Sequence, residues 1–344
     1  MSFLKNSPYC IMLFFLISGE ACKNKTSHTE PANSVEASPA YKNLNDSIRH
    51  FPDDPALYLR RAIRLTQENA HELAYDDFQK AWSLHPVLEV ALPYAANLEI
   101  LGKRGEKLIL LKSLNQQFPS NAQVGRLLAE SYTSSGQAGQ AIIIYNNMIA
   151  KDSLDPETFY EKAMLLEQMK DTFGAIKALQ KAYGFQGVDT YGLELANLYA
   201  EQRNPRALEI CNYILKRDSA QLLIDPLFIK GIYYDNVKQY QKAIAQFDSC
   251  IARDWKTTDA YLEKGRIYFH MENFNAAIQT FNMAMTVTNS DPDAYYWLGR
   301  CYESMHQKVE AVSYYRKAIS LDKNFTEARQ HMEKLDSGFA HPSH

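Results

Sequence analysis

Two arginines are the strongest candidates for chemistry, because Arg266 and Arg300 stand 34 residues apart and each directly follows a glycine. A guanidinium binds a carboxylate through two parallel hydrogen bonds, so the pair is suited to holding an acidic group and not to making or breaking bonds. The sequence contains no phosphate loop, His-Glu-x-x-His, Gly-x-Ser-x-Gly, Cys-x-x-Cys or dinucleotide fingerprint. We therefore expect no enzymatic activity, no cofactor and no metal site.

Charge and cysteine content exclude further classes of protein. The formal net charge is −3 at pH 7, which favours neither nucleic acid nor an anionic membrane surface as a partner. Apart from Cys10 and Cys22 near the start, the chain has Cys211, Cys250 and Cys301, an odd number that cannot all pair within one molecule. We expect these three to be free thiols buried in helices.

The elements that carry Arg266 and Arg300 are repeated. Glycines recur with a spacing of 34 residues, and a tyrosine follows each glycine three positions later. Twelve residues after each glycine comes an alanine, and four residues beyond that an aromatic residue. The columns are Gly231, Gly265 and Gly299; Tyr234, Tyr268 and Tyr302; Ala243, Ala277 and Ala311; Phe247, Phe281 and Tyr315. We expect the glycine to face the alanine of the second helix, with the aromatic residue filling the space toward the next repeat.

This order of residues resembles the tetratricopeptide repeat, a helix–turn–helix unit of the same period. The resemblance extends upstream of the three regular copies through less regular ones. It implies an all-α fold, a right-handed α-solenoid superhelix of about eight units over residues 55–325. The expected repeats are 55–87, 88–121, 122–155, 156–188, 189–223, 224–257, 258–291 and 292–325. Capping helices are expected at 41–54, with Leu44, Ile48 and Phe51 on its apolar side, and at 326–336.

Two stretches depart from the regular pattern. The fifth copy has its small residue, Ala207, one position early and a longer segment after it, so we expect a local change of superhelical twist near residues 203–225. Residues 337–344 are expected to be disordered.

The resemblance also implies a binding surface, because the first helices of such repeats line a concave groove. Carried onto this chain, that frame selects Phe228, Arg266, Phe269, His270, Tyr296 and Arg300. Aromatic anchors beside two arginines favour an acidic peptide or a C-terminal carboxylate as the ligand. The alternative is a solvated groove whose arginines pair with Glu303 or Asp259.

Three acids also recur at one position of the repeat. Asp225, Asp259 and Asp293 fall at the start of successive first helices. They are interpreted as N-caps or as partners of the helix dipoles, and alternatively as an acidic stripe for a basic partner.

The first residues are typical of an export signal. An apolar run too short to span a bilayer precedes Cys22, and this segment resembles the signal of bacterial lipoproteins. We expect a signal peptide at 1–21, lipidation at Cys22 and a flexible tether at 22–40 rich in polar residues. Gly19 and Ala21 also fit ordinary signal cleavage, so a soluble periplasmic product is the alternative.

Taken together, these features predict a non-catalytic adaptor of the bacterial cell envelope. It would hold a peptide or partner protein in its groove and contact the membrane through its lipid anchor only. The alternative is a structural subunit of a permanent envelope assembly or secretion complex that uses its outer faces.

Overall fold

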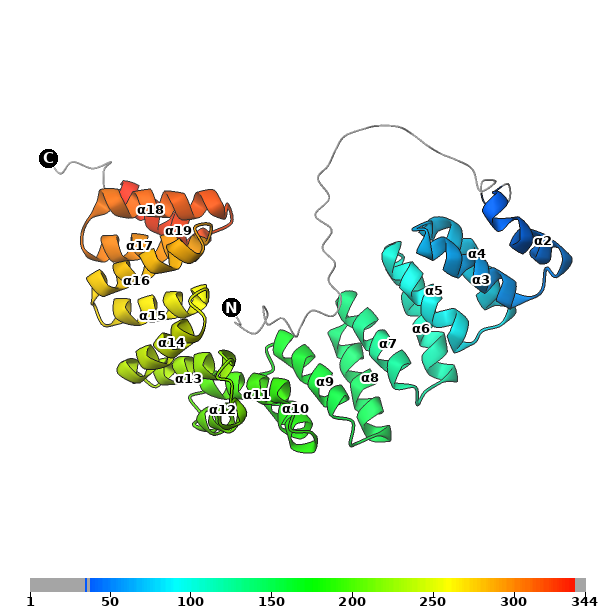
Figure 1. The fold of residues 1–344 in the computed structure, drawn as a ribbon, viewed down its shortest axis with the longest axis horizontal. Coiled ribbons are helices and arrows are strands. Elements are labelled where there is room, and N and C mark those ends of the chain that lie inside the picture. Colours follow the sequence, from blue (N-terminus) through cyan, green and yellow to red (C-terminus); the bar gives the residue numbers. More distant parts are fainter. Residues whose placement is uncertain (1–34, 36–37, 338–344) are drawn as a thin grey trace. The chain divides into compact units, whose positions relative to one another are not determined.

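The computed structural model describes residue 35 and residues 38–337 (Figure 1). The expected signal peptide, Cys22, most of the expected tether and residues 338–344 lie outside the described residues. Within the described part every regular element is a helix, as the sequence predicts. The helices form two compact units, which are separated in sequence between Phe185 and Gln186.

The N-terminal unit consists of one short leading helix and four helical hairpins. Its elements are η3 (Pro39–Tyr41), α2 (Lys42–His50), α3 (Pro55–Gln67), α4 (His71–Leu84), α5 (Leu88–Ile100), α6 (Arg104–Gln117), α7 (Ala122–Ser134), α8 (Ala138–Lys151), α9 (Pro156–Gln168) and α10 (Thr172–Phe185). Hairpin starts are marked by capping side chains: Asp54, Asn121 and Asp155 each accept a hydrogen bond from a backbone N–H in the first turn of the following helix.

Helix α2 packs on the first hairpin through polar contacts as well as apolar ones. Arg61 of α3 donates to Asp77 of α4 from both Nε and Nη2 at 2.7 Å, and its Nη1 donates to the buried Asn45 at 2.8 Å. The expectation that Phe51 lies on the apolar side of this helix is wrong, because its side chain is 65% exposed. Tyr41 and Asn45 are the buried residues instead.

The second hairpin accommodates a lysine where other second helices carry a small residue. Lys107 of α6 is buried, and its Nζ donates to Glu99 of α5 at 2.8 Å. The long apolar stem packs in the hairpin while the ammonium reaches the partly exposed carboxylate at its edge.

The C-terminal unit consists of four further hairpins and a final helix. Its elements are α11 (Asp189–Glu201), α12 (Arg206–Arg217), α13 (Asp225–Asn236), α14 (Tyr240–Arg253), α15 (Thr258–His270), α16 (Phe274–Val287), α17 (Pro292–Ser304), α18 (Lys308–Leu321) and α19 (Thr326–Ser337). Cys211, Cys250 and Cys301 are buried in it as free thiols. Burial raises the pKa of each of these thiols to about 12.

The recurring glycines lie under the aromatic rings of their own hairpins, a contact that the expected packing did not include. A Cβ built on Gly231 or Gly299 would stand 2.6 Å from the ring of Phe247 or Tyr315. The ring of Phe281 covers Gly265 in the same way. Each glycine therefore makes room for the aromatic residue of its own hairpin.

The turn between the two helices of every hairpin contains one residue with a left-handed backbone. These residues are Asn69, Gly102, Gly136, Lys170, Arg203, Lys238, Glu272 and His306, with φ between 55° and 73°. Only two of them are glycine, so the other hairpins accept a conformation that is strained for a residue with a Cβ.

The fifth hairpin is irregular at its end. Helix α12 has 12 residues, whereas α14, α16 and α18 have 14 each. The connection to α13 includes Gln221 with φ of 55°. Asp218 holds this connection, because its carboxylate accepts hydrogen bonds from the N–H groups of Leu222 and Leu223 and from Arg253.

Candidate functional site

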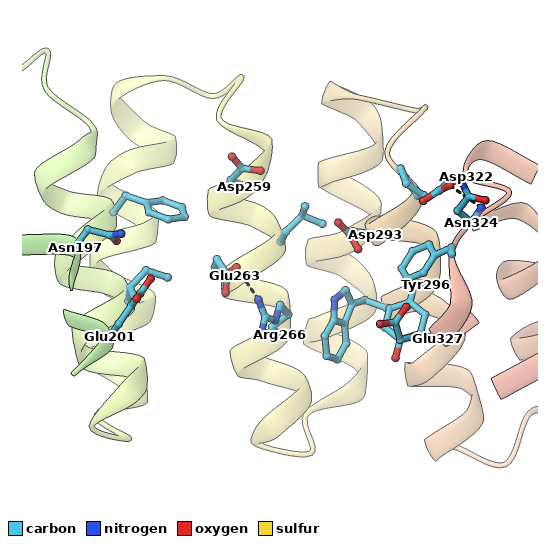
Figure 2. Close-up of a pocket in the computed structure, with 16 residues that line it drawn as sticks. Asn197, Glu201, Asp259, Glu263, Arg266, Asp293, Tyr296, Asp322, Asn324 and Glu327 are labelled. Atoms are coloured by element: carbon cyan, nitrogen blue, oxygen red, sulfur yellow. Dashed lines mark hydrogen bonds and ion pairs between the residues drawn. The ribbon is translucent and has the colours of Figure 1, made fainter. Parts of the chain in front are cut away.

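A groove with a volume of about 650 Å³ runs across the first helices of the C-terminal unit. Helices α11, α13, α15 and α17 each contribute side chains to it, and the chain around the start of α19 forms one end (Figure 2). Because every hairpin turns its first helix toward the same side, residues from four successive repeats meet along one surface.

The apolar part of the groove is mainly aromatic. It comprises Phe228, Ile232, Leu262, Tyr296, Trp297 and Phe325. The ring of Tyr296 lies 5.0 Å from that of Phe325 and 5.5 Å from that of Trp297, measured between centroids. Phe228 and Tyr296 are themselves buried, so these rings form a rigid wall that can bury an apolar side chain or the stem of a long one.

Arg266 is the cation among the lining side chains, and it is already engaged. Its Nη1 donates to Glu263 at 2.7 Å, and its guanidinium lies 5.4 Å from the ring centroid of Trp297. Its Nε is buried and has no hydrogen-bond partner among the described residues. Burial raises the pKa of the Glu263 carboxyl, and the charge of Arg266 opposes this shift.

The remaining charged groups of the groove are acidic. The lining carboxylates are Glu201, Asp259, Glu263, Asp293, Asp322 and Glu327 (Figure 2). Burial raises the pKa of Asp259 and of Asp293, and in both cases the nearby carboxylate of Asp291 adds to the shift. Six carboxylates against one guanidinium give the groove a strongly negative charge when the acids are ionised.

The recurring aspartates do not act as hydrogen-bonding N-caps. The capping positions of α13, α15 and α17 are Ile224, Thr257 and Asp291, and Asp291 alone of these caps through its side chain. Asp225, Asp259 and Asp293 lie in the first turns instead, where a carboxylate interacts favourably with the helix dipole. Asp259 and Asp293 in addition face the groove.

The structure divides the six groove residues selected from the sequence. Phe228, Arg266 and Tyr296 line the groove, whereas Phe269, His270 and Arg300 do not.

Arg300 is not among the residues that line the groove. Its Nη1 donates to the hydroxyl of Tyr296 at 3.1 Å, its Nε is 3.7 Å from Glu303, and its guanidinium lies 5.4 Å from the ring of Phe269. His270 lies 6.4 Å from Trp297 between ring centroids, on the side of Phe269. The two arginines therefore do not form a paired site facing the groove.

Glu263, Trp297 and Phe325 line the groove but were not selected from the sequence. Glu263 and Trp297 each precede the glycine of their repeat by two positions, one turn before the position that Arg266 and Arg300 occupy. This shared position in the repeat could have identified Glu263 and Trp297 from the sequence. Phe325 precedes the final helix and has no counterpart in the repeat pattern, so its role required the structure.

Comparison with family models identifies two of the repeats. Residues 258–291 and 292–325 each match a model described as "Tetratricopeptide repeat". These matched ranges comprise the hairpins α15–α16 and α17–α18, which provide half of the first helices along the groove. Residues 258–325 are therefore two tetratricopeptide repeats. None of the curated protein sequences matches it.

Several solved structures are similar in fold. A tetratricopeptide repeat protein from Parabacteroides merdae is 14% identical, over 82% of this chain and 98% of that chain, with a TM-score of 0.48. The C-terminal part of a repeat protein from Cytophaga hutchinsonii is 15% identical, over 70% and 98%, with a TM-score of 0.49. The Cut9–Hcn1 hetero-tetramer of the APC/C is 18% identical, over 91% of this chain and 60% of that chain, with a TM-score of 0.47. Similarity at this level carries no conclusion about partners.

The described residues contain neither a helix suited to spanning a membrane nor a metal-binding cluster. None of the helices there combines the length and the apolar character that crossing a membrane requires. The same residues contain no group of three or more His, Cys, Asp or Glu side chains arranged to hold a metal ion.

Proposed function

We propose that the protein is a non-catalytic adaptor that holds a segment of a partner protein in the groove of its C-terminal unit. Tetratricopeptide repeats suggest a role in protein interaction, and the observation that supports this particular site is the groove itself. It combines an aromatic wall with charged groups contributed by four successive first helices. Such a surface suits a peptide or helix with alternating apolar and polar side chains.

The expected acidic or C-terminal peptide is poorly supported by the charge of the groove. A partner carboxylate would have to displace Glu263 from Arg266 and approach Asp259 and Asp293. Like charges repel, and breaking the partly exposed Arg266–Glu263 pair would leave Glu263 without its cation. The groove is therefore proposed as the binding site without the carboxylate ligand.

Site-specific photocrosslinking in intact cells tests this function. A crosslinking residue at Asn324, which is exposed on the groove, is compared with one at Met283, which is 51% exposed on the second helix α16. A partner captured from position 324 and lost when Asn197→Trp fills the groove supports the proposal. Capture from position 283 alone would instead favour the structural subunit that binds through its outer faces.

We also propose that the chain is exported and anchored to the envelope membrane by a lipid at Cys22. The support is the sequence of the first residues, an apolar run followed by Gly19-Glu20-Ala21-Cys22. Metabolic labelling with a palmitate analogue, in cells producing the parent or Cys22→Ala, tests the anchor. Label on the parent and not on the variant is expected. Label retained on the variant would contradict lipidation at Cys22, and an unlabelled but shortened parent would indicate a soluble periplasmic product.

A further inference from the structure

The groove carries far more negative charge than its own residues neutralise. Of its seven charged side chains among the described residues, six are carboxylates, and the guanidinium of Arg266 is already paired with Glu263. Among the described residues no cation stands within ion-pair distance of Asp259 or Asp293, although both side chains are partly buried. The acids are partly removed from water, and Arg266 offsets the charge of Asp293 only in part, so most of this negative charge has no counterpart in the groove.

The helix dipoles account for only part of this charge. Asp259, Asp291 and Asp293 gather at the N-terminal ends of α15 and α17. Each helix N-terminus is equivalent to about half a positive charge, so two helices offset roughly one of the three carboxylates. The pKa of Asp293 is raised first by burial and then by Asp291, and Asp259 adds further repulsion. A cation brought between these acids would remove that repulsion.

The neighbouring aromatic residues define what kind of cation fits. Tyr296 and Trp297 stand beside Asp293 on α17, and Phe325 closes that end of the groove. The faces of such rings attract cations, as Arg266 over Trp297 already illustrates in this groove. A lysine or arginine side chain matches both features, because its apolar stem packs on rings while its charged head reaches the carboxylates.

From this arrangement we infer that the groove takes a basic segment of the partner protein, with a lysine or arginine side chain seated between Asp259 and Asp293 and against Tyr296. The inference rests on the proposed function, since it specifies what occupies the same groove. Under this inference, Asp259 and Asp293 form an acidic stripe that binds a basic partner, which is the alternative interpretation of the recurring aspartates. It also excludes polyanions from the groove, because nucleic acid or an anionic lipid surface would be repelled.

Selection from a random peptide library displayed on phage tests the inference, with the full chain immobilised. The selected peptides are then measured in solution against the parent, Asp259→Asn/Asp293→Asn and a matched control, Glu310→Gln/Glu333→Gln. The control removes the same charge from exposed positions outside the groove. Circular dichroism and melting temperature establish that every variant is folded.

We expect the selected peptides to share a lysine or arginine and to bind the aspartate variant about tenfold more weakly than the parent. The control variant is expected to bind like the parent, and added salt to weaken parent binding. Peptides that lose binding to Asn197→Trp but carry no basic residue, or carry acidic ones, would overturn the inference and leave the proposed groove function intact. Peptides whose binding no groove variant alters would overturn both.

Discussion

Arg266 donates a 2.7 Å hydrogen bond to Glu263 one turn earlier on the same helix, so the carboxylate of Glu263 largely neutralises the charge of Arg266 within the groove. The pair is neutral as a whole, so substitutions at its two members are predicted to change the charge of the groove in opposite directions. Arg266→Gln removes the only lining cation and should strengthen binding of a lysine-containing peptide several-fold. Glu263→Gln releases the guanidinium and removes a carboxylate, so it should weaken the same binding by a similar factor.

Fluorescence anisotropy with a labelled peptide measures both effects, and pH provides the control. Arg266 lowers the pKa of Glu263 and of Asp293, so its loss raises both further. The gain expected for Arg266→Gln should therefore be larger at pH 8 than at pH 6, where these carboxyls bind protons more readily. Equal affinities of parent and both variants at pH 8 would contradict the electrostatic account of the groove.

The contact of Gly265 with Phe281 predicts a stability effect. Gly265→Ala would place a methyl group against the ring, which must then shift within a closely packed hairpin. We expect the free energy of unfolding of the C-terminal unit to fall by about 1–3 kcal/mol in urea titration. Gly184→Ala is the control, because nothing lies within 4 Å of its Cβ and alanine favours a helix. An unchanged midpoint for Gly265→Ala would show that the ring moves freely.

The fold class and the groove differ in how far the sequence predicts them. Columns such as Gly265 and Ala277 are periodic because every hairpin repeats the same packing, so their spacing indicates the fold. The contact of Gly265 with the ring of Phe281 was not expected, since spacing alone does not say which side chain of the second helix covers the glycine. Left-handed turns at residues such as Lys238 and Glu272 leave no signal, because the hairpin imposes them on residues of many types.

Where a predicted site residue lies depends on its partners within the chain. Arg266 and Arg300 occupy equivalent positions, yet Arg266 lines the groove while Arg300 contacts Tyr296 and Glu303 and does not line it. Sequence spacing treats the two as identical. The acids at 259 and 293 were visible as a stripe, and their interpretation depended on the absence of capping hydrogen bonds that only the structure reveals.

The irregular connection after α12 is predicted to depend on one carboxylate. Asp218 is 5% exposed, and Arg253 bridges it to the carbonyl oxygen of Leu223. Asp218→Ala removes the acceptor for two backbone N–H groups and leaves Arg253 without its carboxylate, so residues 218–224 should open more often. We expect limited proteolysis to cut there several-fold faster than in the parent.

Asp254→Ala is the matched control for this loop. Asp254 also follows a second helix and accepts a backbone hydrogen bond, from the N–H of Lys256 at 2.9 Å, but it has no arginine bridge. Cleavage at 218–224 should be unchanged in this variant. Equal cleavage rates at 218–224 in the parent and in Asp218→Ala would show that the connection is held by other contacts.

In the N-terminal unit, Glu161 predicts a dependence of stability on pH. Burial raises its pKa to about 7 from the ordinary value of 4.5, although Arg126 donates to its carboxylate at 3.1 Å and opposes the shift. The folded unit therefore binds more protons than the unfolded chain between these values, so this group makes the unit less stable as pH rises from about 4.5 to about 7. Below that interval the group is protonated in both states, and above it the cost is constant.

Glu161→Gln should remove this cost. Relative to the parent, the free energy of unfolding of the variant's N-terminal unit should rise by about 1–2 kcal/mol between pH 5 and pH 8, a figure reduced to allow for partial solvent exposure of the carboxyl. Urea titrations at the two pH values measure the difference. Glu72→Gln, at an exposed first-turn position of α4, removes the same charge and is the matched control. If the Glu161→Gln difference changes with pH no more than that of Glu72→Gln, Glu161 titrates in the folded unit as it does in the unfolded chain.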